Sequence, residues 1–182
     1  MGYALARAAV EAGAATCLVS GPVDLDVPAG VRVIQVESAM QMYDQCLSLL
    51  DDCDIFIACA AVADYRPSEH SAQKIKKTAD EMTVSLVRNP DIVSAVAANA
   101  PRPFTVGFAA ETNDVLNYAR DKMQRKKLDM IVANDVADRS IGFASDENAV
   151  TVLWQDGEQP VAKASKDAIA RQIIALIAQL NT

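Results

Sequence analysis

The fold is decided by a nearly continuous apolar run, Asp54-Ile55-Phe56-Ile57-Ala58-Cys59-Ala60-Ala61. A short run of this kind predicts a strand that is buried on both faces of a parallel sheet. Short stretches rich in β-branched residues, or alternating apolar and polar residues, lie on both sides of it and predict further strands. These strands are expected at Thr16–Ser20, Val31–Val36, Met82–Val87, Phe104–Ala110, Met130–Ala133 and Ala149–Trp154.

Amphipathic segments separate these strands. They predict helices at Met1–Ala12, Ser38–Leu50, Asp91–Asn99, Asp114–Leu128 and Ser165–Leu180, and Ser165 is a suitable N-cap for the last of them. The alternation of strands and helices predicts an α/β fold with a doubly wound, mainly parallel, Rossmann-like sheet and helices on both faces. Ligands bind at the carboxyl ends of the strands in such folds, so functional residues are expected directly after the strands.

The composition of the 182 residues limits the classes of function. A hydrophobic content of 51% fits one domain, residues 1–182, with a substantial core. The net charge of −7 argues against nucleic-acid binding. No apolar run approaches the ~18 residues of a membrane span, and no signal peptide opens the chain. We therefore expect a cytoplasmic protein that binds neither nucleic acid nor membrane.

The cysteines and the single histidine do not predict a metal site. Cys17, Cys46, Cys53 and Cys59 contain no C-x-x-C pair, and one histidine, His70, cannot complete a Cys/His zinc site. We expect four reduced, mostly buried thiols.

Two basic clusters stand out in this acidic chain. Lys74-Ile75-Lys76-Lys77 lies in a polar stretch after the strand at Asp54–Ala61. Lys122, Arg125 and Lys126 share one face of the predicted helix Asp114–Leu128. Lysine clusters of this kind neutralise phosphate groups, although a solvated charged face is the other interpretation.

Three residues that follow strands have both a structural and a functional interpretation. Asp64 either caps a turn or faces a ligand, Phe108 either belongs to the core or presents its ring to a base, and Asn134 either binds ligand or forms an Asx turn. The chain has neither a G-x-G-x-x-G after a strand nor a P-loop, so any nucleotide is bound by another arrangement. Tyr118-x-x-x-Lys122 matches the catalytic pair of short-chain dehydrogenases, which leaves an NAD(P)-dependent oxidoreductase as an alternative.

Seven segments in order resemble the bacterial phosphopantothenoylcysteine synthetases, the synthetase half of the bifunctional phosphopantothenoylcysteine decarboxylase/synthetase proteins of coenzyme A biosynthesis. They are Met1–Ala6, Leu18–Val23, Ala60–Arg66, Lys74–Lys77, Asn89–Ile92, Val106–Thr112 and Ala133–Val136. The resemblance implies a ligase that uses CTP to convert the carboxylate of 4'-phosphopantothenate into an acyl-cytidylate, with release of pyrophosphate. The amine of L-cysteine then attacks this intermediate, and CMP leaves.

The resemblance also implies roles for individual residues. Lys74 corresponds to the catalytic lysine, which neutralises charge on the reacting phosphate. The expected nucleotide-binding residues are Ala58, Cys59, Ala60, Asp64, Lys74, Pro90, Asp91, Ile92, Val93, Phe108, Lys122 and Lys126. Ala61 and Asn134 are expected to contact the second substrate. Mg²⁺ is expected to arrive with the nucleotide, without a protein metal site, and FMN belongs to the decarboxylase half.

The last implications concern partners and the chain's start. Family members are homodimers, and the stretch Asp64–Arg88 resembles their flap and subunit contact. In the family, a strand and a Gly- and Ser-rich loop precede the position of Met1, so we expect this chain to be truncated there and the natural protein to contain that segment. The FMN-dependent decarboxylase domain is the expected covalent or physical partner. A fragment that binds nucleotide without catalysis is a further alternative.

Overall fold

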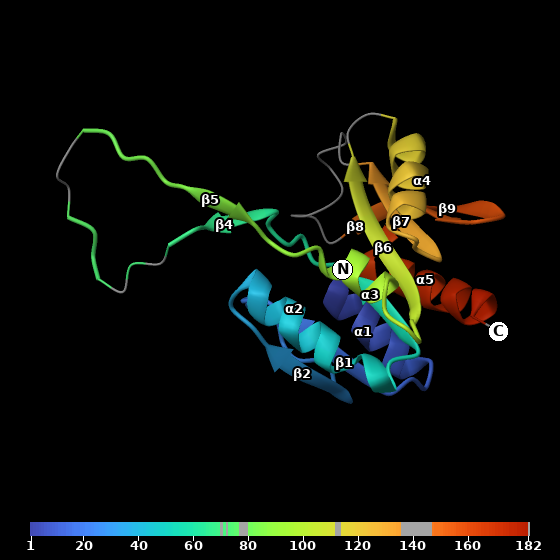
Figure 1. The fold of residues 1–182 in the computed structure, drawn as a ribbon. Helices are drawn as coiled ribbons and strands as arrows, with labels where there is room; N and C mark the ends of the chain where they lie inside the picture. Colours follow the sequence, from blue (N-terminus) through green and yellow to red (C-terminus); the bar gives the residue numbers. More distant parts are fainter. Residues whose placement is uncertain (70, 72, 77–79, 112–113, 136–146, 182) are drawn as a thin grey trace.

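A computed structural model of the protein describes residues 1–69, 71, 73–76, 80–111, 114–135 and 147–181. Figure 1 shows the arrangement of its helices and strands. In chain order they are α1 (Gly2–Glu11), β1 (Thr16–Ser20), β2 (Val31–Gln35), α2 (Ala39–Ser48), a short 3-10 helix (Leu50–Asp52), β3 (Ile55–Ala58), β4 (Tyr65–Pro67), β5 (Leu86–Arg88), α3 (Ile92–Ala97), β6 (Phe104–Glu111), α4 (Val115–Arg125), β7 (Met130–Asp135), β8 (Glu147–Trp154), β9 (Gly157–Ser165) and α5 (Lys166–Leu180).

A five-stranded mixed sheet, in the order β3-β6-β7-β8-β9, forms the centre of the α/β fold. β3, β6 and β7 run parallel to one another, whereas β8 is antiparallel to both β7 and β9. β1 and β2 form a separate parallel pair, and β4 and β5 a separate antiparallel pair. The sheet is therefore mixed, unlike the mainly parallel sheet expected, because β8 and β9 form a hairpin that places Trp154 opposite Gly157.

Helices cover both faces of this sheet, as predicted. Alternate residues of β7 point to opposite faces: Met130 and Val132 belong to the cluster that contains α1 and α5 side chains, whereas Ile131 and Ala133 belong to the cluster that contains α4 side chains. All four are at most 1% exposed. The parallel part of the sheet is therefore rigidly packed from both sides, and its carboxyl edge is held in place.

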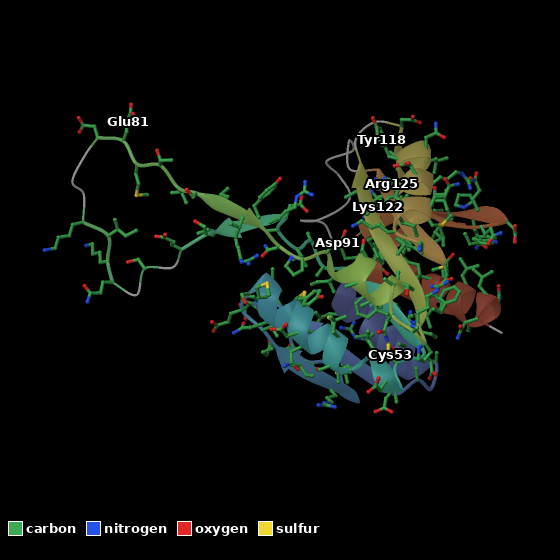
Figure 2. The ribbon with its side chains drawn as sticks, in the orientation of Figure 1. Cys53, Glu81, Asp91, Tyr118, Lys122 and Arg125 are labelled. Carbon is green, nitrogen blue, oxygen red and sulfur yellow. The ribbon has the colours of Figure 1, made fainter. Side chains whose placement is uncertain are left out.

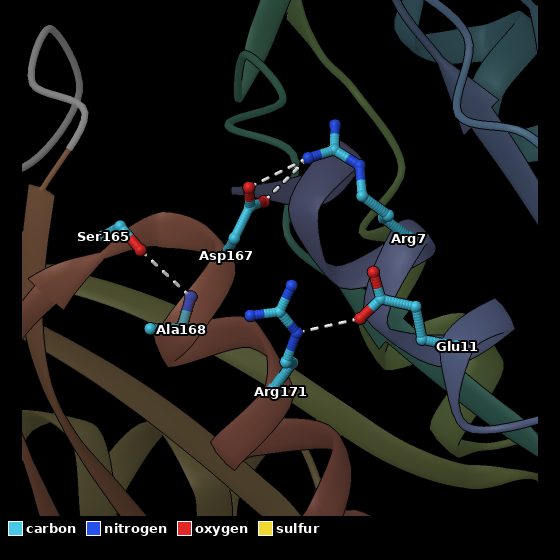
Figure 3. Close-up of polar contacts among 6 residues, drawn as sticks. All are labelled: Arg7, Glu11, Ser165, Asp167, Ala168 and Arg171. Atoms are coloured by element: carbon cyan, nitrogen blue, oxygen red, sulfur yellow. Dashed lines mark hydrogen bonds and ion pairs between the residues drawn. The ribbon is translucent and has the colours of Figure 1, made fainter.

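α1 packs on α5, far apart in sequence but side by side in the fold (Figure 3). Arg7 Nη1 lies 2.9 Å from Asp167 Oδ1, and Arg171 Nε donates to Glu11 Oε2 at 2.8 Å. Such exposed ion pairs contribute only ~0–1 kcal/mol, so the buried apolar residues of both helices stabilise the contact. The predicted N-cap is confirmed, because Ser165 Oγ accepts from the Ala168 amide at 3.3 Å.

Several sequence predictions need correction. β3 is not buried on both faces: Ile55 is 37% exposed, because β3 is the edge strand of the five-stranded sheet. Cys17 is exposed, and only Cys46 is fully buried, although all four thiols are free. The predicted strand Met82–Val87 shrinks to Leu86–Arg88, and β4 and β9 were not predicted. Within the described part of the chain, no helix is long and apolar enough to cross a membrane.

The described residues of the stretch 64–88, here called the arm, extend away from the body of the protein (Figure 1). Its two legs pair through β4 and β5, where Tyr65 lies opposite Arg88, and the Ser68 amide also donates to the Ser85 carbonyl oxygen at 2.9 Å. Several large apolar side chains along it are exposed: Tyr65, Ile75, Met82, Val84, Leu86 and Val87. A two-stranded ribbon of this kind is at most marginally stable alone, so its direction depends on its root.

Candidate active site

A cavity of about 820 Å³ lies at the carboxyl ends of β3, β6 and β7. Its wall is formed by the end of β3 and the segment after it (Ala58–Tyr65), by the segment Arg88–Val93 around the start of α3, and by the end of β6 (Phe108–Ala110). Met1, Lys122, Lys126 and polar residues of β7, β8 and α5 complete it. This volume is in the range of small-molecule sites. The position agrees with the rule that ligands bind beyond the carboxyl ends of parallel strands.

The structure brings nearly all the predicted site residues together in this cavity. Those that line it are Ala58, Cys59, Ala60, Ala61, Asp64, Pro90, Asp91, Ile92, Val93, Phe108, Lys122, Lys126 and Asn134. Lys74 does not line it and lies exposed on the arm. Lys77, Thr112 and Val136, which belong to the quoted motifs, lie outside the described residues.

Two lysines, one turn apart, line the cavity: Lys122, which α4 carries (Figure 2), and Lys126, the C-cap residue of the same helix. Lys122 Nζ donates to the carbonyl oxygen of Phe108 at 2.8 Å, and Lys126 Nζ lies 2.8 Å from Asp91 Oδ2. Arg125, predicted on the same face, instead pairs with Asp121 at 2.6 Å, and its side chain is 64% exposed. The basic face of this helix is therefore divided: the two lysines face the cavity, and the arginine belongs to the solvated surface.

Asp91 links the cavity to the start of α3. Its Oδ1 accepts from the Ser94 amide at 3.1 Å, so it caps the helix, while its Oδ2 pairs with Lys126. Burial acts to raise the pKa of Asp91, but the hydrogen bonds from Lys126 and Ser94 outweigh it and hold the pKa below its ordinary value. The carboxylate is thus ionised and keeps the Lys126 ammonium at the cavity wall.

Asn134 supplies a buried acceptor to the same cavity. Its Oδ1 is buried and has no hydrogen-bond partner among the described residues. An unpaired buried acceptor costs ~1–3 kcal/mol, so this oxygen is suited to a ligand N–H or O–H group. Asn134 lies within β7, opposite Val150, and the Asx-turn interpretation is therefore wrong.

Five polar residues of the cavity wall were not among the predicted site residues: Tyr65, Arg88, Asn89, Asn148 and Lys166. Tyr65 and Asn89 belong to quoted segments and Arg88 directly precedes one, so the motifs themselves were an available signal. Asn148 is 2% exposed, and its Oδ1 accepts from the Ala149 amide at 3.0 Å. It reaches the cavity because β8 runs antiparallel to β7, which places its first residues at the same edge.

The alternative oxidoreductase pair is not assembled. Tyr118 is 57% exposed and does not line the cavity, whereas Lys122 does. The phenol therefore lies apart from the place where a substrate and a nicotinamide ring would have to meet.

Comparisons with known proteins give consistent results. Residues 1–180 match the family described as DNA/pantothenate metabolism flavoprotein, C-terminal domain. The chain is 54% identical over 183 residues to the coenzyme A biosynthesis bifunctional protein CoaBC of Vibrio vulnificus (strain YJ016), an alignment that covers 99% of this chain and 46% of that protein. It is 47% identical over 178 residues to the protein of the same name from Escherichia coli (strain K12), covering 96% and 44%. The chain thus spans about half the length of the curated relatives it matches.

A solved structure agrees with the sequence match. The crystal structure of the C-terminal domain of a coenzyme A biosynthesis bifunctional protein CoaBC superimposes with a TM-score of 0.82 at 35% identity. The superposition covers 98% of this chain and 81% of that one.

Proposed function

The chain belongs to the family of DNA/pantothenate metabolism flavoprotein C-terminal domains, and from this premise we propose that it is a CTP-dependent ligase that joins 4'-phosphopantothenate to L-cysteine in coenzyme A biosynthesis. The resemblance noted in the sequence is therefore a family relationship. We treat residues 1–182 as the ligase domain of a larger bifunctional protein, with the FMN-dependent decarboxylase domain as its partner.

The observation that carries the proposal is the cavity at the carboxyl edge, whose wall contains both Lys122 and Lys126. Activation of a carboxylate by a nucleoside triphosphate brings two anions together, so the site has to offset their repulsion with cations. The two lysines bind the triphosphate, and Lys126 leaves Asp91 to do so. Phe108 contacts the base, and the segments at Ala58–Ala61 and Pro90–Val93 line the rest of the nucleotide site.

The reaction proceeds in two steps. A carboxylate oxygen of 4'-phosphopantothenate attacks the α-phosphorus of CTP, and the bond to the β-phosphate breaks to release pyrophosphate. The amine of L-cysteine then attacks the acyl carbon, the acyl–oxygen bond to CMP breaks, and the amine loses a proton. Lys74 neutralises charge on the reacting phosphate. Asn134 Oδ1 accepts a hydrogen bond from the second substrate.

Mg²⁺ is proposed to enter with the nucleotide. Among the described residues, no group of three or more His, Cys, Asp or Glu side chains could hold a metal ion. Mg²⁺ in nucleotide sites is held by the phosphates and one or two carboxylates, and Asp64, an exposed carboxylate of the cavity wall, fits that requirement. When bound, the ion would supply charge neutralisation on the phosphates.

The arm supports a homodimer. Its exposed apolar side chains belong to none of the hydrophobic clusters formed by the described residues, so a second copy is proposed to cover them. The four free thiols fit a reducing compartment, and we place the reaction in the cytoplasm.

Calorimetric titration with CTP, ATP and NADPH, followed by an assay of pyrophosphate release, tests this function. We expect CTP to bind in preference to ATP and NADPH, and pyrophosphate to form only when 4'-phosphopantothenate is present. Preferential binding of NADPH would support the oxidoreductase alternative. Binding of CTP without turnover under any combination of substrates would indicate a nucleotide-binding fragment.

A further inference from the structure

Arg88 is a cation at the edge of the cavity for which neither the sequence analysis nor the proposed reaction gives a role. It is the last residue of β5, it lines the cavity and its side chain is exposed. None of the ion pairs between described residues involves Arg88. Lys126, by contrast, is neutralised by Asp91. The Arg88 guanidinium can therefore meet an incoming anion without first breaking an ion pair.

The aromatic ring of Tyr65 orients this guanidinium. Tyr65 and Arg88 lie opposite each other in the β4–β5 pair, and the guanidinium carbon is 5.9 Å from the centroid of the ring. A cation at this distance is attracted by the ring quadrupole. A hydrogen bond with the Tyr65 side chain also raises the pKa of Arg88 above its ordinary value.

The backbone around Arg88 is held from both sides. Arg66 Nη1 donates to the Arg88 carbonyl oxygen at 2.7 Å and to Asn89 Oδ1 at 3.0 Å. The Asn89 amide donates to the Asp64 carbonyl oxygen at 2.8 Å, and Asn89 Nδ2 donates to the Ala63 carbonyl oxygen at 2.9 Å. The root of the arm is thus tied to the segment that follows β3. A cation that is positioned before binding loses less freedom when it binds.

We propose that Arg88 binds the terminal phosphate of the second substrate at the edge of the cavity, and so makes the ligase select the phosphorylated substrate over its unphosphorylated form. The inference rests on the proposed function, because the substrate's reacting carboxylate has to reach the triphosphate beside the partly buried Lys122 and Lys126. The other end of the substrate then extends toward the exposed edge. A phosphomonoester carries a charge of about −1.5 to −2 at pH 7, and the planar guanidinium can donate two parallel hydrogen bonds to it.

The test combines a change in the protein with a change in the ligand. Arg88→Gln and Arg88→Lys are compared with the wild type, using 4'-phosphopantothenate and pantothenate as substrates at saturating CTP and L-cysteine. Arg32→Gln is the matched control, because Arg32 is an exposed arginine of β2 that does not line the cavity. Thermal melting of each variant verifies that it folds.

We expect Arg88→Gln to lower the preference for the phosphorylated substrate by about tenfold or more. The loss should arise from a higher KM for 4'-phosphopantothenate, while kcat and the KM for CTP stay unchanged. Arg88→Lys should keep part of the preference, because it retains the charge but not the planar fork, and Arg32→Gln should keep all of it. The assignment is wrong if Arg88→Gln reduces the preference no more than Arg32→Gln does.

A direct titration separates this inference from the proposed function. If the wild-type chain makes no product, the ligase function fails, and Arg88 is then tested by calorimetric binding of 4'-phosphopantothenate alone. Weaker binding by Arg88→Gln than by Arg32→Gln would still support the phosphate site. Equal binding by the two variants would overturn it.

Discussion

In the five-stranded sheet, Val106, Met130 and Val132 are completely buried, whereas every described side chain of the arm from Pro67 to Arg88 is exposed. The sheet holds the cavity residues by packing from both faces, so Lys122, Lys126 and Asn134 are in place before a ligand arrives. Among the described residues, the arm is held at its root, through the short β4–β5 pair and by the hydrogen bond from the Ser68 amide to the Ser85 carbonyl oxygen. The chain therefore positions the cavity residues by burial and the arm residues by attachment at the root, so the two sets should respond differently to substitution.

The largest expected effect comes from the arm. Lys74→Ala should abolish product formation while the melting temperature stays unchanged, because no core packing depends on this exposed side chain. Product formation and thermal melting are measured with Lys163→Ala as the control, since Lys163 is a lysine of β9 outside the cavity wall. Near wild-type turnover of Lys74→Ala would show that Lys74 takes no part in the reaction, and the sheet and the arm would then not differ in the way described.

Substitutions should affect the free energy of unfolding strongly in the sheet and very little in the arm. Ile131→Ala, at a residue that is 0% exposed, should lower the free energy of unfolding by ~2–5 kcal/mol. Met82→Ala on the arm, where the side chain is 69% exposed in the single chain, should change it by no more than about 0.5 kcal/mol at a protein concentration low enough that no second copy covers the arm. Denaturant unfolding at a fixed protein concentration measures both values. A loss for Met82→Ala as large as that for Ile131→Ala would mean that the arm packs as part of the folded core.

The two lysines of the cavity wall are positioned before a ligand binds, so their substitution should affect nucleotide affinity. Lys122→Ala and Lys126→Ala should each weaken CTP binding by ~1–3 kcal/mol and weaken CMP binding less, because CMP lacks the phosphates that they contact. Calorimetric titration of both nucleotides gives the difference. Equal losses for CTP and CMP would place these side chains away from the β- and γ-phosphates.

The smallest effect concerns the ion pair between Asp91 and Lys126. Asp91→Asn should keep the helix cap, since Asn is as good an N-cap as Asp, but lose the charge. The pKa of Asp91 is lower in the folded state than in the unfolded state, so its contribution is complete above the unfolded pKa and is lost as the pH falls through the folded pKa. The small stability advantage of the wild type over Asp91→Asn should therefore be present at neutral pH and vanish in acid. Melting curves that differ equally at both pH values would contradict it.

Much of the central fold could be predicted from the sequence because burial leaves a periodic pattern. Thr16–Ser20 was predicted exactly, and the helix at Ser165–Leu180 within one residue. β9 was missed because its polar residues and Pro160 hide the pattern, although Asp156-Gly157 is a recognised hairpin signal. β4 is too short to show any periodicity. Met82–Val87 alternates apolar and polar residues, but only its last residues pair with another strand, because the arm does not join the five-stranded sheet. Local pattern therefore predicts the packed elements well and the arm poorly.

The candidate site was likewise predicted where local motifs mark it and missed where it depends on the tertiary fold. The motifs directly after β3 and β6 were found because ligands gather at strand ends, and the structure brings them together. Asn148 and Lys166 were missed because their proximity depends on the antiparallel return of β8 and on the position of α5, which no local spacing encodes. Lys74 was assigned both to the site and to the polar stretch Asp64–Arg88. The structure places it exposed on the arm and outside the cavity wall, because the direction of the arm depends on its root, which the spacing of Lys74–Lys77 does not encode.

The affinity of Lys74→Ala for CTP, measured by calorimetric titration beside the wild type and Lys126→Ala, tests most directly whether the cavity and the arm have separate roles. We predict that Lys74→Ala binds CTP as tightly as the wild type while making no product, because Lys74 does not line the cavity and acts only on the reacting phosphate. Lys126→Ala should bind CTP more weakly. A loss of CTP affinity in Lys74→Ala as large as that in Lys126→Ala would contradict the division between a preformed cavity and a separately positioned arm.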